Sequence, residues 1–209
     1  MTPTTRKIIS ITSGVLAFLI AAVLIGFWSN RLAERTVSSP FPTLRDTAFA
    51  LPSTQGPSTQ DTPAVLKNTD LLGKPTALFF GFTHCPEICP ATLYTLSQMK
   101  ADIGADRLQI IFATVDPARD TIPILKDYIS AIDDTAIGLS GTEAQMQAMA
   151  RSFGAYAQKI MLDDDDYTMD HTATVYLYDE DGLAAGTIAW GEPDDTTRTK
   201  LRNLTANTL

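Results

Sequence analysis

Two cysteines, four residues apart, carry the most informative chemistry in this chain of 209 residues, which has only two histidines besides. Cys85 and Cys89 lie in residues 81–90 (GFTHCPEICP), a spacing that lets two sulfurs bond each other or share one metal ion. A disulfide scaffold needs more cysteines spread along the chain, and structural zinc usually takes four N or S ligands. The pair therefore indicates a redox site or a metal site, with two inert buried cysteines as the alternative.

Pro90 indicates where the helix that carries this motif begins. Proline is tolerated in the first turn of a helix and is costly further in, so Cys89 should lie at the helix start and Cys85 in the preceding turn. Thiolates at that position face unpaired amide groups and the positive end of the helix dipole. We therefore expect the pKa values of these thiols to be lowered.

The elements around the motif predict an α/β fold. In chain order they are a strand at 76–82, a helix at 90–103, a strand at 108–115, helices at 121–132 and from 142, strands at 172–178 and 183–190, and a helix at 194–206. A parallel βαβ unit followed by an antiparallel hairpin and a closing helix is typical of a thioredoxin-like fold, with a central mixed sheet flanked by helices. The segment 44–70 is harder to interpret and predicts a short strand at 48–51.

His171 directly precedes the predicted strand at 172–178. In a thioredoxin-like fold the loop before this strand packs against the cysteine motif, so we expect His171 to lie beside Cys85 and Cys89. Two thiolates and one imidazole suit Cu(I), because soft sulfur ligands select it. A surface histidine that bonds a loop carbonyl is the alternative.

The cysteine motif resembles the signature of the SCO/SenC family, copper proteins that assist the assembly of cytochrome c oxidase. Three later stretches match that family in order, namely 115–121 (VDPARDT), 138–142 (GLSGT) and 166–172 (DYTMDHT). The resemblance covers roughly residues 70–190. It implies one copper ion bound by Cys85, Cys89 and His171, with Cu(I) favoured and Cu(II) as a second state.

Three further residues are expected near this site without binding the metal. The family pattern suggests that Asp116 orients or tunes the site, although a turn residue at a strand end is the plain alternative. Asp170 is expected either to steady His171 through its other ring nitrogen or to be solvated. His84 should point away from Cys85, because neighbouring residues on an extended segment face opposite sides.

Two functions compete for this site. The first is a metallochaperone that passes copper by ligand exchange to the cytochrome c oxidase subunit that carries the CuA site, with another copper chaperone or a thiol reductant as further partners. The second is a membrane-anchored thiol–disulfide oxidoreductase, in which Cys85 and Cys89 form a redox-active pair that cycles through a disulfide bond. Only the second would make the chain an enzyme. A peroxiredoxin-type peroxidase is disfavoured, because Phe82 and Pro86 occupy the positions where that family needs a threonine.

An uncharged apolar segment at residues 8–28 predicts a single transmembrane helix, since 21 residues at about 1.5 Å each span a hydrocarbon core of about 30 Å. It exceeds the apolar region of a cleaved signal peptide, about 7–15 residues, so we expect an uncleaved anchor. The basic residues 1–7 are expected to be cytoplasmic and 29–43 to be a tether. Residues 44–209 would then form the copper-binding domain on the periplasmic side of the cell inner membrane.

The charge of the chain limits its partners. Its formal net charge is −8, and residues 36–209 carry 23 acidic and 12 basic side chains. Such a domain repels nucleic-acid phosphates, which excludes a nucleic-acid partner. The acidic run at 163–166 is expected to be a solvated loop.

Overall fold

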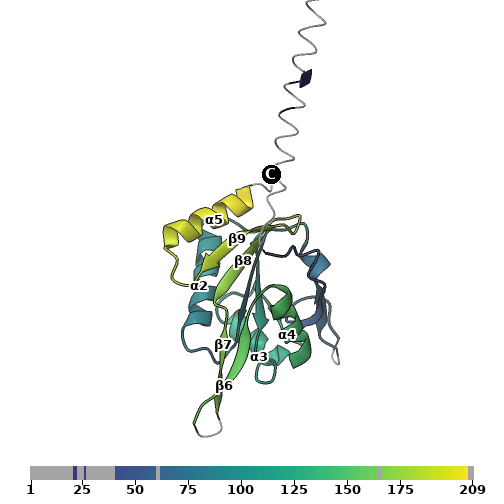
Figure 1. The fold of residues 1–209 in the computed structure, drawn as a ribbon, viewed down its shortest axis with the longest axis vertical. Helices are drawn as coiled ribbons and strands as arrows, with labels where there is room; N and C mark the ends of the chain where they lie inside the picture. Colours follow the sequence, from purple (N-terminus) through teal and green to yellow (C-terminus); the bar gives the residue numbers. More distant parts are fainter. Residues whose placement is uncertain (1–20, 23–25, 27–40, 60–61, 164–165, 207–209) are drawn as a thin grey trace, which may run out of the picture. The chain divides into compact units, whose positions relative to one another are not determined.

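The computed structural model describes residues 21–22, 26, 41–59, 62–163 and 166–206 (Figure 1). Most of the predicted membrane anchor, 8–28, and most of the tether, 29–43, lie outside the described residues. In the part of the chain that is described, none of the helices has both the length and the apolar character needed to cross a bilayer. The strands and helices below belong to one compact unit, Ser39–Leu209.

A mixed sheet of seven strands, counted over the described residues, forms the centre of this unit in the order β2-β1-β5-β4-β3-β8-β9. Its strands are β1 Ala50–Ser53, β2 Ala64–Lys67, β3 Thr76–Gly81, β4 Gln109–Thr114, β5 Ile137–Leu139, β8 Thr174–Tyr178 and β9 Ala184–Ala189. The strands β3, β4 and β5 run parallel, whereas β8 pairs antiparallel with β3 and β9 antiparallel with β8. The predicted thioredoxin-like fold is therefore confirmed.

Helices connect the strands and close the described part of the chain. They are the short 3-10 helix η1 Asn68–Leu71 and the α-helices α2 Ile88–Asp102, α3 Ile122–Ser130, α4 Glu143–Ser152 and α5 Asp194–Ala206. The helices α2 and α5 lie side by side (Figure 1), and Nη1 of Arg198 donates a hydrogen bond to Oδ2 of Asp102 at 2.9 Å. At the start of α4, Oγ1 of Thr142 accepts a hydrogen bond from the amide of Gln145, a helix cap that the sequence predicts.

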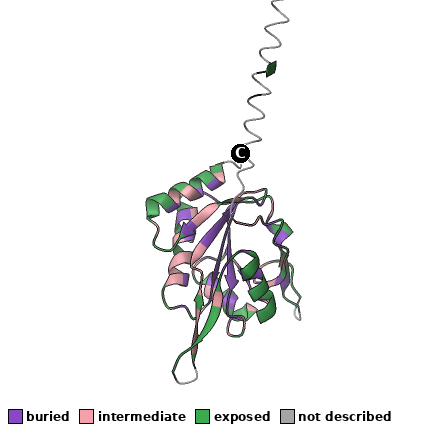
Figure 2. Ribbon diagram, viewed as in Figure 1, coloured by how far each residue is buried: buried purple, intermediate pink, exposed green. Residues whose placement is uncertain are grey.

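Aromatic rings fill both sides of the sheet, because successive residues of a strand face opposite sides. On one side Phe79 meets Phe112 edge to face, with ring centroids 4.9 Å apart. On the other side Phe80 meets Phe153, which follows α4, and Tyr176 of β8. Figure 2 shows that the buried residues concentrate in these central strands.

The sequence prediction missed a second, smaller sheet. It consists of β6 Ala157–Met161 and β7 Tyr167–His171, which pair antiparallel and project from the central sheet as a hairpin (Figure 1). Most of β6 is exposed, so it lacks the apolar pattern by which a strand is recognised. The expectation that His171 lies in a loop was consequently wrong, because it is the last residue of β7 and β8 begins three residues later. The strand predicted at 48–51 is found as β1, two residues further on.

We predict that Phe153→Ala lowers the free energy of unfolding by about 3–5 kcal/mol, the usual cost of removing a buried phenyl ring. Phe153 is fully buried and its ring contacts those of Phe80, Tyr176 and Tyr178. Urea unfolding provides the measurement. Tyr94→Ala is the matched control, because Tyr94 is 57% exposed on α2 and its loss should change stability by less than about 0.5 kcal/mol. Equal effects of the two substitutions would contradict this description of the core.

Candidate metal centre

The two cysteines lie at the junction between β3 and α2. Cys85 is in the connection after β3 and Cys89 is the second residue of α2, so Pro90 falls in the first turn as predicted. Both are buried free thiols, with exposures of 8% and 2%. The backbone amide of Cys89 donates a hydrogen bond to Sγ of Cys85 at 3.3 Å. The helix start therefore holds the two sulfur-bearing side chains against each other.

Gly81, the last residue of β3, makes room for the Cys89 sulfur. A Cβ atom at this position would lie 2.9 Å from Sγ of Cys89 and 2.9 Å from Cζ of Phe112. Both contacts are too short for any side chain to be accepted without displacing its neighbours. The absence of a side chain at Gly81 thus lets α2 pack close to the end of β3.

His171 reaches the same place from the end of β7. Its Nε2 lies 3.7 Å from Sγ of Cys89, and its ring packs edge to face against Phe82 at a centroid distance of 5.7 Å. Its Nδ1 lies 3.1 Å from the carbonyl oxygen of Thr172. A carbonyl oxygen only accepts hydrogen bonds, so in the neutral ring the proton sits on Nδ1 and the lone pair of Nε2 faces the thiol.

This arrangement suits a metal ion. Ligand atoms bonded at about 2.0 Å for N and 2.3 Å for S, with angles of 109–120°, lie about 3.5–3.7 Å apart, which is the separation between Cys89 and His171. Histidine ligands commonly donate their other ring N–H to a backbone carbonyl, as His171 does. The cavity that the two residues line has a volume of about 10 Å³, enough for an ion or a water and too small for an organic substrate.

Cys85, the third predicted ligand, does not face the other two. Over the described residues, no three His, Cys, Asp or Glu side chains are grouped closely enough to hold an ion as they stand. Cys89 and His171 face each other, whereas the sulfur of Cys85 accepts the Cys89 amide. The structure therefore brings together two donors and holds the third beside them.

Burial sets the protonation of both facing groups. It raises the pKa of the Cys89 thiol far above its usual value, and the nearby Cys85 and Asp120 raise it further, whereas the Phe82 amide lowers it. For Cys89 the expected lowering of the pKa was therefore wrong, because loss of solvent outweighs the helix start. Burial also lowers the pKa of His171, against smaller effects of the Thr172 carbonyl and Asp170 that raise it. Near neutral pH the site holds a thiol and a neutral imidazole.

Asp170 does not hold the second ring nitrogen of His171. That nitrogen faces the Thr172 carbonyl, and Asp170 is exposed. Neighbouring residues of β7 point to opposite faces, so the strand that turns His171 inward turns Asp170 outward. His84 is also exposed, and its Nδ1 lies 3.2 Å from Oγ1 of Thr83.

Asp116 is almost fully buried, and its carboxylate is occupied by groups other than the thiols. One oxygen pairs with Nε of Arg119, and the other accepts a hydrogen bond from the hydroxyl of Tyr167 at 2.9 Å. Asp116 therefore connects to the site through Tyr167, which lies four residues before His171. Arg119 and Tyr167 both lie in stretches that resemble the SCO/SenC family, but the sequence alone predicts no role for either residue.

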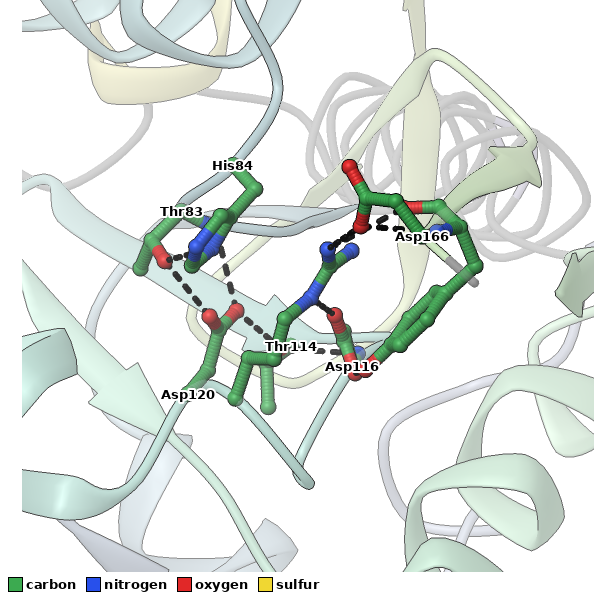
Figure 3. A network of polar contacts seen from close by, with 8 residues as sticks. Thr83, His84, Thr114, Asp116, Asp120 and Asp166 are labelled. Atoms are coloured by element: carbon green, nitrogen blue, oxygen red, sulfur yellow. Dashed lines mark hydrogen bonds and ion pairs between the residues drawn. The ribbon is translucent and has the colours of Figure 1, made fainter. Parts of the chain in front are cut away.

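Asp120, which directly precedes the helix predicted at 121–132, holds the segment that leads to Cys85. Its fully buried carboxylate accepts hydrogen bonds from the amide of Thr83 at 3.0 Å, from Oγ1 of Thr83 at 2.6 Å and from Oγ1 of Thr114 at 2.5 Å (Figure 3). The helix cap itself is Thr121. The sequence held no signal for this clamp beyond the presence of an acidic residue after β4.

The fold and the site define a thioredoxin-like protein with a buried pair of thiols, one of which faces a histidine. The chain belongs to the SCO1/SenC family, whose model matches residues 46–206.

Among curated relatives, the mitochondrial SCO2 homologue of Bos taurus is 39% identical over 119 residues, which are 54% of this chain and 45% of the relative. The SCO2-like protein of Rickettsia felis is 34% identical over 122 residues, 56% of this chain and 60% of the relative. The chain thus matches about half the length of these relatives. The solved structure of Bradyrhizobium japonicum ScoI with copper bound is similar at a TM-score of 0.66 and 36% identity, over 75% of this chain and 97% of that one.

We predict that Asp120→Asn lowers the free energy of unfolding by about 1–3 kcal/mol, because the amide NH₂ cannot accept one of the three buried hydrogen bonds. Urea unfolding of the reduced protein measures the change. Asp46→Asn is the control, since Asp46 is exposed and accepts only a local hydrogen bond from Thr43. If Asp120→Asn were as stable as the parent and the control, the hydrogen bonds from Asp120 to Thr83 would contribute nothing to stability.

The lowered pKa of His171 predicts a loss of stability in mild acid. The unfolded chain takes up the proton near pH 6.5, whereas the folded chain takes it up only at lower pH. The contribution of His171 to the free energy of unfolding of the metal-free protein should therefore be fully present above pH 7 and be lost between pH 7 and 5.5. Urea unfolding at these pH values, compared with His171→Gln, which does not titrate, isolates this contribution. An identical pH dependence in parent and variant would show that His171 is not buried as a neutral ring.

Proposed function

We propose that this chain is a copper metallochaperone that binds one copper ion through Cys85, Cys89 and His171 and delivers it to the CuA-carrying subunit of cytochrome c oxidase. The observation that carries the proposal is the pairing of Sγ of Cys89 with Nε2 of His171 at 3.7 Å. Membership of the SCO1/SenC family supports it, as does the likeness to a copper-bound ScoI structure.

The donor set favours Cu(I). Two sulfur donors and one imidazole are soft ligands, which bind Cu(I) in preference to hard divalent ions, and Cu(II) is a second state that an imidazole also suits. The hydrogen bond of His171 to the Thr172 carbonyl keeps the lone pair of Nε2 free for the ion. To complete the site, the Cys85 side chain must turn away from the Cys89 amide, so that its sulfur faces the same ion as the Nε2 lone pair.

Protons accompany copper uptake in this proposal. The Cys89 thiol stays protonated at neutral pH because burial raises its pKa, so the ion displaces a proton when it binds. His171 has no proton on Nε2 to displace. Transfer to a partner would proceed by ligand exchange, in which incoming donors replace Cys85, Cys89 and His171 one at a time. A proton released by an incoming thiol, or taken from solvent, would return to Cys89.

A thiol–disulfide oxidoreductase is the second candidate, and the adjacent free thiols favour it. Cys85 and Cys89 are buried together and linked by the Cys89 amide. The attacking species in such an exchange is a thiolate, however, and the raised pKa of Cys89 suppresses its thiolate near neutral pH. This leaves Cys85 as the attacking residue under the second candidate.

The cellular setting follows from the sequence pattern. A single-pass anchor at residues 8–28 in the cell inner membrane would place the copper-binding domain on the periplasmic side, with the oxidase subunit and another copper chaperone or a thiol reductant as partners. Because the domain is acidic, its docking surfaces on those partners should be basic or neutral.

We predict that His171→Ala lowers the Cu(I) affinity of the reduced protein by at least about tenfold, since one of three ligands is lost. Competition with a Cu(I) chelator measures the affinity. The matched control is His84→Ala, which removes the other histidine of the chain, an exposed one, and should leave the affinity unchanged. A protein that acts only as a thiol reductase would respond to neither substitution, and that result would refute the copper-binding proposal.

A further inference from the structure

The hairpin that carries His171 has little of its own to fix its position. The strands β6 and β7 pair only with each other in the sheet topology, and most residues of β6 are exposed (Figure 2). At the base of the hairpin the amide of Thr172 donates to the carbonyl of Tyr156, which closes the hairpin on itself. From outside the hairpin, Phe82 contacts the His171 ring at the end of β7, and the start of β7 needs a second contact to keep the strand in place.

Arg119, in the connection between β4 and α3, supplies such a contact. Its Nη1 donates a hydrogen bond to the backbone oxygen of Tyr167 at 3.0 Å, and its guanidinium carbon lies 3.8 Å from the centre of the Tyr167 ring. The same group approaches Oδ1 of Asp166 at 3.6 Å. One side chain thus holds the first residue of β7 through its backbone and its ring.

Asp116 holds both Arg119 and Tyr167 in place. It pairs with Nε of Arg119 and accepts a hydrogen bond from the hydroxyl of Tyr167. The Asp116 side chain is only 2% exposed and that of Arg119 only 18%, so water screens their interaction weakly. The guanidinium fork fixes direction as well as distance, which a simple point charge would not do.

The geometry of β7 carries this position to the metal donor. Tyr167 and His171 are four residues apart on one strand, so their side chains leave it on the same face. The register with β6, from Met161 opposite Tyr167 to Ala157 opposite His171, keeps the strand extended between them. When Tyr167 is held at the start of β7, the orientation of the strand is fixed. The direction in which the His171 side chain points at the end of β7 is then fixed as well.

We propose that Asp116, Arg119 and Tyr167 form a latch that positions His171 against Cys89 and thereby sets the metal affinity of the site. This inference rests on the proposed copper-binding function. The three are positioning residues, because none of them contacts the sulfurs or the His171 ring in the hydrogen bonds and ion pairs described above.

The test uses Arg119→Lys and Tyr167→Phe in the full-length chain. Lysine keeps a charge beside the buried Asp116 and cannot also hold the Tyr167 backbone in the same fork, and phenylalanine removes only the hydroxyl bonded to Asp116. Arg198→Lys is the matched control, because Arg198 pairs with Asp102 between α2 and α5. Three quantities are measured, namely amide hydrogen exchange in β7 without metal, the imidazole ¹⁵N resonances of His171 without metal, and Cu(I) affinity by chelator competition.

For Arg119→Lys we expect β7 amides to exchange about tenfold faster, because a hydrogen bond from a charged donor is lost. The His171 resonances should shift toward those of a solvated ring, and the Cu(I) affinity should fall by about tenfold, as for other groups that orient a ligand. Tyr167→Phe should change all three quantities in the same direction by a smaller factor. Arg198→Lys should change none of them, and the loss of affinity in the latch variants should exceed what any shift of their urea midpoint accounts for.

Unchanged exchange, resonances and affinity in both latch variants would overturn the proposal. So would a fall in affinity that merely follows a fall in the urea midpoint, since that result would mean general destabilisation. Failure of the copper-binding function is distinguishable, because the parent would then bind no Cu(I) while the two metal-free measurements still report on the latch.

Discussion

The whole site depends on one buried contact, in which a ring nitrogen carrying a lone pair faces a thiol that burial keeps protonated. Cys89 and His171 are 82 residues apart in the chain and meet at 3.7 Å. The contact works only if the imidazole carries its proton on the other nitrogen, and the Thr172 carbonyl ensures that it does. A small ion that replaces the thiol proton would find two ligands already separated by a suitable distance.

Two clusters, linked to each other through Thr114, hold the two halves of this contact. On the thiol side, the buried Asp120 carboxylate fastens Thr83 to β4, and Gly81 leaves room for the Cys89 sulfur. On the imidazole side, Asp116 and Arg119 fasten Tyr167 at the start of β7. Both clusters originate in the five residues from Asp116 to Asp120, so a single connection after β4 supports both donors.

The same burial that brings the donors together also selects among functions. A dithiol reductase needs a thiolate that is exposed and readily formed, whereas Cys89 is buried and has a raised pKa. A metal carrier gains from burial, because the ion is shielded from water and released only when a partner supplies competing donors. Under the proposed copper-binding function, proton exchange at Cys89 would couple metal uptake and release to the local pH.

The sequence alone predicted five of the seven described strands of the central sheet, the helix start beside Cys89 and the resemblance to the family, because apolar runs, proline position and short motifs are local signals. It missed β2 and β5, which have only four and three residues. It could not determine the β6–β7 hairpin, since β6 is exposed and carries no apolar pattern. Nor could it assign roles to Asp116, Asp120, Arg119 or Tyr167, whose partners are distant in the chain. The raised pKa of Cys89 could not be predicted from the sequence either. The helix start lowers a thiol pKa through local groups, whereas desolvation raises it to an extent that depends on how the whole tertiary structure packs around the sulfur.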